Sequence, residues 1–173
     1  MSGDVLTELQ RICFVMNDEP RWLIALLRYT DMRLVEAVGL LSDDVSLDDC
    51  NSHINLQEHR WRSLKPRLTV WEVPLVGASK WAAKRIKDIG NEFAFPKNCS
   101  KAKFNVNSAS AALNKLFKRG VADECVIHSF RHSLRDRQRE VECPSDVVDA
   151  IGGWVHRARW PRLWQGIQVG CLT

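Results

Sequence analysis

The feature that most constrains the fold is a short, strongly apolar segment near the N-terminus. Residues 22–27 read Trp-Leu-Ile-Ala-Leu-Leu, one residue after the triplet Asp18-Glu19-Pro20. Proline is well tolerated in the first turn of a helix, because no backbone N–H is needed there. We therefore predict a helix that begins near Pro20. Its apolar composition indicates that other elements cover it.

The rest of the chain alternates helical and strand patterns. Apolar residues recur at helical spacing in most segments, and two short segments are typical of strands of an antiparallel sheet. Ser79 is the predicted N-cap of one helix. The sequence thus predicts an α+β fold, mainly helical with a small antiparallel sheet. Besides the helix after Pro20, we expect helices at residues 5–16, 79–87, 107–120, 126–141 and 144–151, and strands at 53–56 and 71–75.

Length, charge and cysteine content limit the class of protein. The chain has 173 residues, enough for one domain with a substantial core. Its 25 Lys and Arg against 21 Asp and Glu give a net charge of +4, which permits a nucleic-acid partner without requiring one. The six cysteines show no close pairing and no C-x-x-C spacing, so we expect reduced thiols in a cytoplasmic protein. We find no signal peptide and no apolar run of membrane-spanning length.

The segment richest in candidate catalytic residues runs from Val126 to Val141. Phe130, Leu134 and Val141 recur at helical spacing and predict one buried stripe. His128 and Arg131 are three residues apart, so they share a helix face. A guanidinium beside an imidazole that titrates near neutral pH suits a phosphate undergoing reaction. On spacing alone, a solvated polar face explains the same residues.

The motifs of this stretch resemble the catalytic domain of the tyrosine recombinases, the phage integrase family. The matching sequences are His-Ser-Phe-Arg-His-Ser-Leu-Arg-Asp-Arg from His128, Cys-Pro-Ser-Asp from Cys143 and Ile-Gly-Gly-Trp from Ile151. Upstream, Thr-Asp-Met-Arg-Leu-Val-Glu-Ala from Thr30 extends the resemblance, which covers roughly residues 15 to 154. It implies strand cleavage and rejoining through a 3′-phosphotyrosine, with neither a metal nor a nucleotide cofactor.

The resemblance assigns five catalytic positions. Arg33 and Arg131 would clamp the non-bridging phosphate oxygens. His128 would be the acid–base partner of the nucleophile, and Lys65 would protonate the leaving 5′ oxygen. Trp154 would complete the pocket and donate one hydrogen bond from its ring.

Two departures from the family pattern lie close to these positions. Asp31 stands where the family normally has glycine, which adds negative charge beside a phosphate site. After Lys65, the family's polar turn is replaced by the more apolar Pro-Arg-Leu-Thr-Val-Trp of residues 66–71.

The expected partner is double-stranded DNA, with other recombinase protomers as further partners. Arg62, Lys97, Lys101 and Lys103 are the candidate contacts to the DNA backbone, although basic residues in loops are also often just solvated.

The expected nucleophile is absent. The family places a tyrosine roughly nine residues beyond Trp154, but Leu163 stands there, and the single tyrosine of the chain is Tyr29. Undoing one inserted base after the Trp154 codon forces glycine at positions 160 and 164 and, with permitted synonymous codons, gives a tyrosine at 163. A frameshifted end therefore explains residues 155–173, which we expect to pack poorly. A genuine alternative C-terminus is the competing explanation.

Two functional hypotheses follow from these observations. The first is a decayed, catalytically inactive recombinase of a prophage or mobile element. The second is a non-enzymatic module that binds DNA or a protein partner with the same pocket. By either hypothesis, we divide the chain into a recombinase-like domain, residues 1–154, and a basic tail, residues 155–173.

Overall fold

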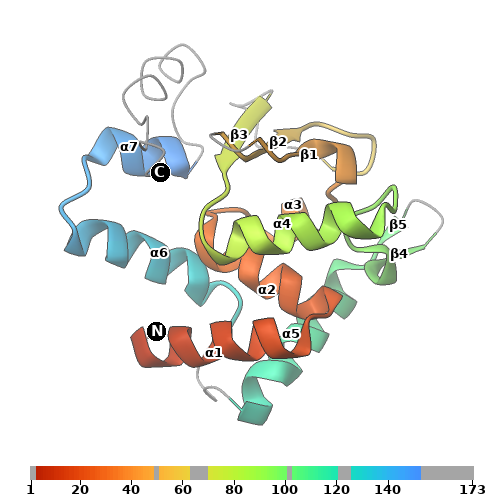
Figure 1. Ribbon diagram of the computed structural model, residues 1–173, viewed down its shortest axis with the longest axis horizontal. Helices are drawn as coiled ribbons and strands as arrows, with labels where there is room; N and C mark the ends of the chain where they lie inside the picture. Colours follow the sequence, from red (N-terminus) through yellow and green to blue (C-terminus); the bar gives the residue numbers. More distant parts are fainter. Residues whose placement is uncertain (1–2, 49–50, 63–69, 101–102, 121–125, 153–173) are drawn as a thin grey trace.

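The computed structural model describes residues 3–48, 51–62, 70–100, 103–120 and 126–152. These residues form mainly helices, with two small antiparallel sheets (Figure 1). The predicted α+β fold is confirmed. In chain order the elements are α1 (Gly3–Met16), α2 (Glu19–Tyr29), α3 (Leu34–Val38), the 3₁₀ turn η1 (Ser42–Asp44), β1 (Val45–Ser46), β2 (His53–Gln57), β3 (Val70–Pro74), α4 (Ala78–Ile89), the 3₁₀ turn η2 (Pro96–Asn98), β4 (Cys99–Ser100), β5 (Lys103–Phe104), α5 (Val106–Gly120), α6 (Ser129–Glu140) and α7 (Ser145–Ile151).

The apolar segment forms α2, the central helix of the molecule. Asp18 is its N-cap, and the Asp18 carboxylate accepts a hydrogen bond from the backbone N–H of Arg21 at 3.2 Å. Pro20 occupies the first turn, as predicted. Every residue from Trp22 to Arg28 is buried, because α1, α4, α5 and α6 all pack against this helix (Figure 1).

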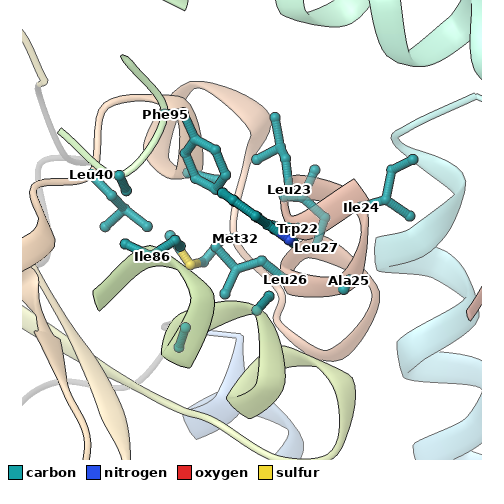
Figure 2. Packing of buried hydrophobic residues seen from close by; sticks show 14 of the residues in the cluster. Trp22, Leu23, Ile24, Ala25, Leu26, Leu27, Met32, Leu40, Ile86 and Phe95 are labelled. Atoms are coloured by element: carbon teal, nitrogen blue, oxygen red, sulfur yellow. The ribbon is translucent and has the colours of Figure 1, made fainter. Parts of the chain in front are cut away.

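The core around α2 also fixes the segment that follows it. Leu40, Ile86 and Phe95 come from other parts of the chain and pack with the α2 side chains and Met32 (Figure 2). Full burial of each such side chain stabilises the fold by roughly 1.5–3 kcal/mol. Thr30 is 0% and Met32 1% exposed, so the backbone at residues 30–33 is held on both sides of Asp31.

The larger sheet has the strand order β1-β2-β3. Strands β2 and β3 pair antiparallel, with Ile54 opposite Val73 and Leu56 opposite Trp71. These four side chains are buried, while the alternate residues are more exposed, which is the period of two that a one-sided sheet requires. The two predicted strands are confirmed. The connection between them includes residues 63–69, which lie outside the described part of the chain.

Helix α4 begins differently from the prediction. Its N-cap is Gly77, whose φ of +53° lies in the region that favours glycine, and not Ser79. The Ser79 hydroxyl instead donates a hydrogen bond to the Val76 carbonyl at 2.7 Å and accepts one from the Val76 N–H at 3.0 Å. Ser79 thus stabilises the turn that leads into the helix.

The stretch expected at 126–141 forms the shorter helix α6. Phe130 and Leu134 are buried as predicted, but Val141 is 76% exposed. The prediction for Val141 is wrong because the helix ends at Glu140 and Glu142 adopts a positive φ of 51°. No helix within the described ranges is long and apolar enough to cross a membrane.

Candidate active site

A cavity of about 380 Å³ opens where three distant segments meet. Residues at the α2–α3 junction form one wall, α5 forms the second, and the start of α6 forms the third. The structure thereby brings the predicted site residues Arg33, His128 and Arg131 around one space. The complete lining consists of Leu27, Met32, Arg33, Leu34, Val35, Ser110, Asn114, Val126, Ile127, His128, Phe130 and Arg131.

Arg33 is held at the N-terminus of α3 by Glu36. The Glu36 carboxylate accepts hydrogen bonds from the backbone N–H of Arg33 at 2.6 Å and from its Nη1 at 3.3 Å. The Glu36 side chain is 8% exposed, whereas that of Arg33 is 34% exposed. Glu36 therefore holds the backbone N–H and Nη1 of Arg33, and the Arg33 side chain still reaches solvent.

Arg131 is held by Asp31, which precedes it by 100 residues. Arg131 Nε donates to Asp31 Oδ1 at 2.7 Å, and Arg131 Nη2 donates to Asp31 Oδ2 at 3.0 Å. Arg135, one helical turn further along α6, also donates from Nη2 to Asp31 Oδ2, at 3.3 Å. Asp31 is 2% exposed, so one buried carboxylate bridges two arginines.

The contacts of Asp31 and Arg135 were not foreseen from the sequence. The spacing of Arg131 and Arg135 by four residues was a usable signal, because such residues share a helix face. Nothing in the local sequence identifies Asp31 as their partner.

His128 is the N-cap of α6, and its backbone already has helical angles, φ −63° and ψ −23°. The backbone carbonyl of His128 accepts a hydrogen bond from Arg131 N–H at 3.2 Å, which joins the two residues in one turn. The imidazole is exposed, and its centroid lies 5.0 Å from that of His132 in an edge-to-face arrangement. An exposed imidazole on the cavity rim can exchange a proton with a bound group.

The structure contradicts the prediction that Arg62 contacts the DNA backbone. It is 2% exposed, and all three guanidinium nitrogens donate to protein oxygens. Nε and Nη2 donate to the carbonyl of Gln57, Nη1 donates to the carbonyl of Gly39, and Nη2 also donates to Asp44 at 3.0 Å. A DNA phosphate cannot reach this group without breaking these bonds, so we remove Arg62 from the candidate contacts.

The remaining predicted residues divide into two sets. Lys97 and Lys103 are exposed at η2 and β5, and Lys97 Nζ lies 3.9 Å from the Glu19 carboxylate. Lys65, Lys101, Trp154 and Leu163 lie outside the described residues.

Comparison with known proteins identifies the same family as the motifs. The sequence matches the phage integrase family over residues 6–159. No curated protein matches the chain at a significant level.

Several solved structures have a similar fold. XerA recombinase is 16% identical with a TM-score of 0.69, and the match covers 96% of this chain and 62% of XerA. The XerH site-specific recombinase, bound to its palindromic difH substrate, is 17% identical with a TM-score of 0.66 and is covered to 52%, against 98% of this chain. The Tn1549 transposon integrase in complex with circular intermediate DNA is 14% identical with a TM-score of 0.60, covered to 59%, against 94% of this chain.

The chain therefore spans between half and two thirds of the length of these solved proteins. At such identities the structural likeness establishes the fold, and the sequence match establishes the family. This chain belongs to the phage integrase family and has the fold of its tyrosine recombinase catalytic domain.

Proposed function

We propose that this chain is a copy of the catalytic domain of a site-specific DNA recombinase. We propose further that it binds duplex DNA but does not cleave it. The observation that carries the proposal is the convergence of Arg33, His128 and Arg131 on one cavity. Two guanidinium groups and an imidazole around one space suit a phosphodiester, which offers paired acceptor oxygens and a proton-transfer step.

The family chemistry assigns a role to each of these groups. Arg33 and Arg131 would bind the non-bridging oxygens and stabilise the charge that develops on them in the transition state. His128 would exchange a proton with the attacking hydroxyl. Lys65 and Trp154 would complete the site, by resemblance to the family. The proposed chemistry needs neither a metal nor a nucleotide cofactor.

The proposed lack of cleavage rests on the missing nucleophile. The chain has one tyrosine, Tyr29, and it is not among the described residues that line the cavity. The Tyr29 hydroxyl donates to Gln10 Oε1 at 2.9 Å, and the guanidinium groups of Arg28 and Arg137 lie over the Tyr29 ring, 5.1 and 5.7 Å from its centroid. A phenol so engaged does not replace the tyrosine expected at position 163.

The test combines DNA binding with a search for a covalent product. A short fluorescent duplex should bind weakly at low salt, and the logarithm of the affinity should fall linearly with the logarithm of the salt concentration, by about 0.9 for each phosphate contacted. A nicked suicide substrate should give no covalent protein–DNA adduct. Absence of binding at low salt, or an adduct formed by this chain, would contradict the proposal.

The proposal extends to the tail, residues 155–173. We propose that it contributes no active-site group and that it results from a shifted reading frame. Restoring the frame after the Trp154 codon should place a tyrosine at 163 and give some adduct with the suicide substrate. A binding module selected without catalysis should give no adduct even then, so this measurement separates the two functional hypotheses.

A further inference from the structure

We propose that Asp31 is a positioning residue: it holds Arg131 by one edge of the guanidinium and leaves the other edge free to bind a phosphate. This inference rests on the proposed DNA binding, and it assigns a role to a residue that stands where the family has glycine. The alternative is that Asp31 competes with phosphate for Arg131. The two roles predict opposite experimental results.

The hydrogen-bond geometry favours positioning. An arginine has five N–H donors, on Nε, Nη1 and Nη2. Asp31 takes one from Nε and one from Nη2, at 2.7 and 3.0 Å. Three donors remain, and within the described part of the chain Arg131 Nη1 donates no hydrogen bond. The edge formed by Nη1 and Nη2 can likewise bind two oxygens of a phosphate side by side.

The location of Asp31 supports the same role. Asp31 is 2% exposed and lies between the buried residues Thr30 and Met32, whose packing holds its backbone in place. Arg131 lines the cavity, whereas Asp31 is not among the described residues that line it. The carboxylate therefore contacts the arginine without lining the cavity itself.

The charge balance reduces the repulsion that a buried carboxylate exerts on a phosphate. Arg135 donates to the same carboxylate at 3.3 Å, so the three side chains of Asp31, Arg131 and Arg135 together carry a net charge of +1. Asp31 thus fixes the orientation of Arg131 without cancelling the positive charge of the cluster. A fixed guanidinium also loses less rotamer freedom when a phosphate binds.

The test is a double-mutant cycle measured by binding of the short fluorescent duplex at low salt. R131A is compared with the unaltered chain, and again in a D31N background. If Asp31 positions Arg131, removing Arg131 should weaken binding about tenfold when Asp31 is present but only about threefold when residue 31 is asparagine. The sign of this difference reports the role, whichever way D31N alone changes the affinity.

The other outcomes overturn the inference. A larger loss from R131A in the D31N background would show that Asp31 competes with phosphate. Equal losses in both backgrounds would show that Asp31 only stabilises the fold. D136N is the matched control, because it removes one carboxylate from an exposed position of α6, the helix that carries Arg131. R131A should cost the same with and without D136N.

A second measurement needs no change at Asp31 and covers the case in which D31N fails to fold. The side-chain Nε–H signal of Arg131, assigned by its loss in R131K, should exchange slowly with water in the unaltered chain. It should remain protected when the duplex is added, because the phosphate binds the other edge. An unprotected Nε–H, or protection lost on DNA binding, would overturn the positioning role of Asp31 but not the proposed DNA binding. Absence of DNA binding in every variant would instead overturn the proposed function, and with it the phosphate-binding part of this inference.

Discussion

Within the described part of the chain, two buried aspartates bind arginines, and the two pairs differ in how many arginine donors stay unused. Asp44 is 1% exposed and binds Arg62, which is 2% exposed. Asp31 is 2% exposed and binds Arg131, whose side chain is 14% exposed. By charge and distance the pairs look alike, at 3.0 and 2.7 Å.

The difference lies in the remaining donors. Every nitrogen of the Arg62 guanidinium donates to a protein oxygen, so the group ties the C-terminal end of β2 at Gln57 to Gly39 and η1. Arg131 donates to Asp31 from one edge only and lines the cavity. Unused donors at a cavity, rather than a carboxylate partner or a basic neighbourhood, therefore distinguish an arginine available to a ligand from a structural one.

The largest expected effect comes from breaking the structural pair. D44A would leave Arg62 buried and without its counter-ion, and it would also remove the acceptor for Leu41 N–H at 3.0 Å. Loss of one partner of a buried ion pair costs about 3–5 kcal/mol of stability. Urea unfolding followed by far-UV circular dichroism measures the change. D43A is the control, because the Asp43 side chain is fully exposed, and it should stay within about 0.5 kcal/mol of the unaltered chain. Equal effects of D43A and D44A would refute the structural role.

The next effect concerns binding and tests the other side of the comparison. R131A should weaken duplex binding about tenfold, because a hydrogen bond to a charged group is worth about 1.5–3 kcal/mol. R139A removes the same charge from an exposed position of α6, where Arg139 pairs, among the residues that the structure describes, only with Asp136 at 3.5 Å. Fluorescence anisotropy at fixed low salt should show a much smaller change for R139A. Similar losses for both variants would mean that only net charge matters.

A smaller effect is expected for a third arginine–carboxylate pair, Arg33 and Glu36, whose two residues lie within one helical turn. E36A removes the acceptor of the Arg33 backbone N–H, a bond of 2.6 Å at the start of α3, and should cost about 1 kcal/mol, as the loss of a helix cap does. E36Q keeps an oxygen acceptor and should recover part of that stability, which urea unfolding measures. If E36A and E36Q are equally destabilised, the charge of Glu36 matters more than its cap.

The sequence predicted the parts of the fold that depend on local pattern. The apolar run at 22–27 predicted the central helix, and strand alternation predicted β2 and β3, because burial on one face leaves a periodic signal. The resemblance to the tyrosine recombinases predicted that Arg33, Lys65, His128, Arg131 and Trp154 belong to one site. The prediction for Arg62 was wrong, since composition shows a basic turn but not where each guanidinium points. The contact of Asp31 with Arg131 joins residues 100 positions apart, and no local pattern carries that information.

The smallest predicted effect concerns a buried ionisable group that no counter-ion neutralises. Cys13 is 1% exposed, and burial raises the pKa of its thiol from 9.0 to about 12, although Arg21 and Arg28 partly oppose the shift. The folded chain therefore keeps this proton between pH 9 and pH 12, while the unfolded chain releases it. The contribution to stability is full below pH 9 and is lost as the pH rises toward 12. Between pH 8 and pH 9.5 the loss should be about 0.8 kcal/mol. Urea unfolding of the unaltered chain and of C13A at both pH values isolates it, because every other group titrates in both proteins. Equal pH dependence of the two would show that the thiol is not held neutral.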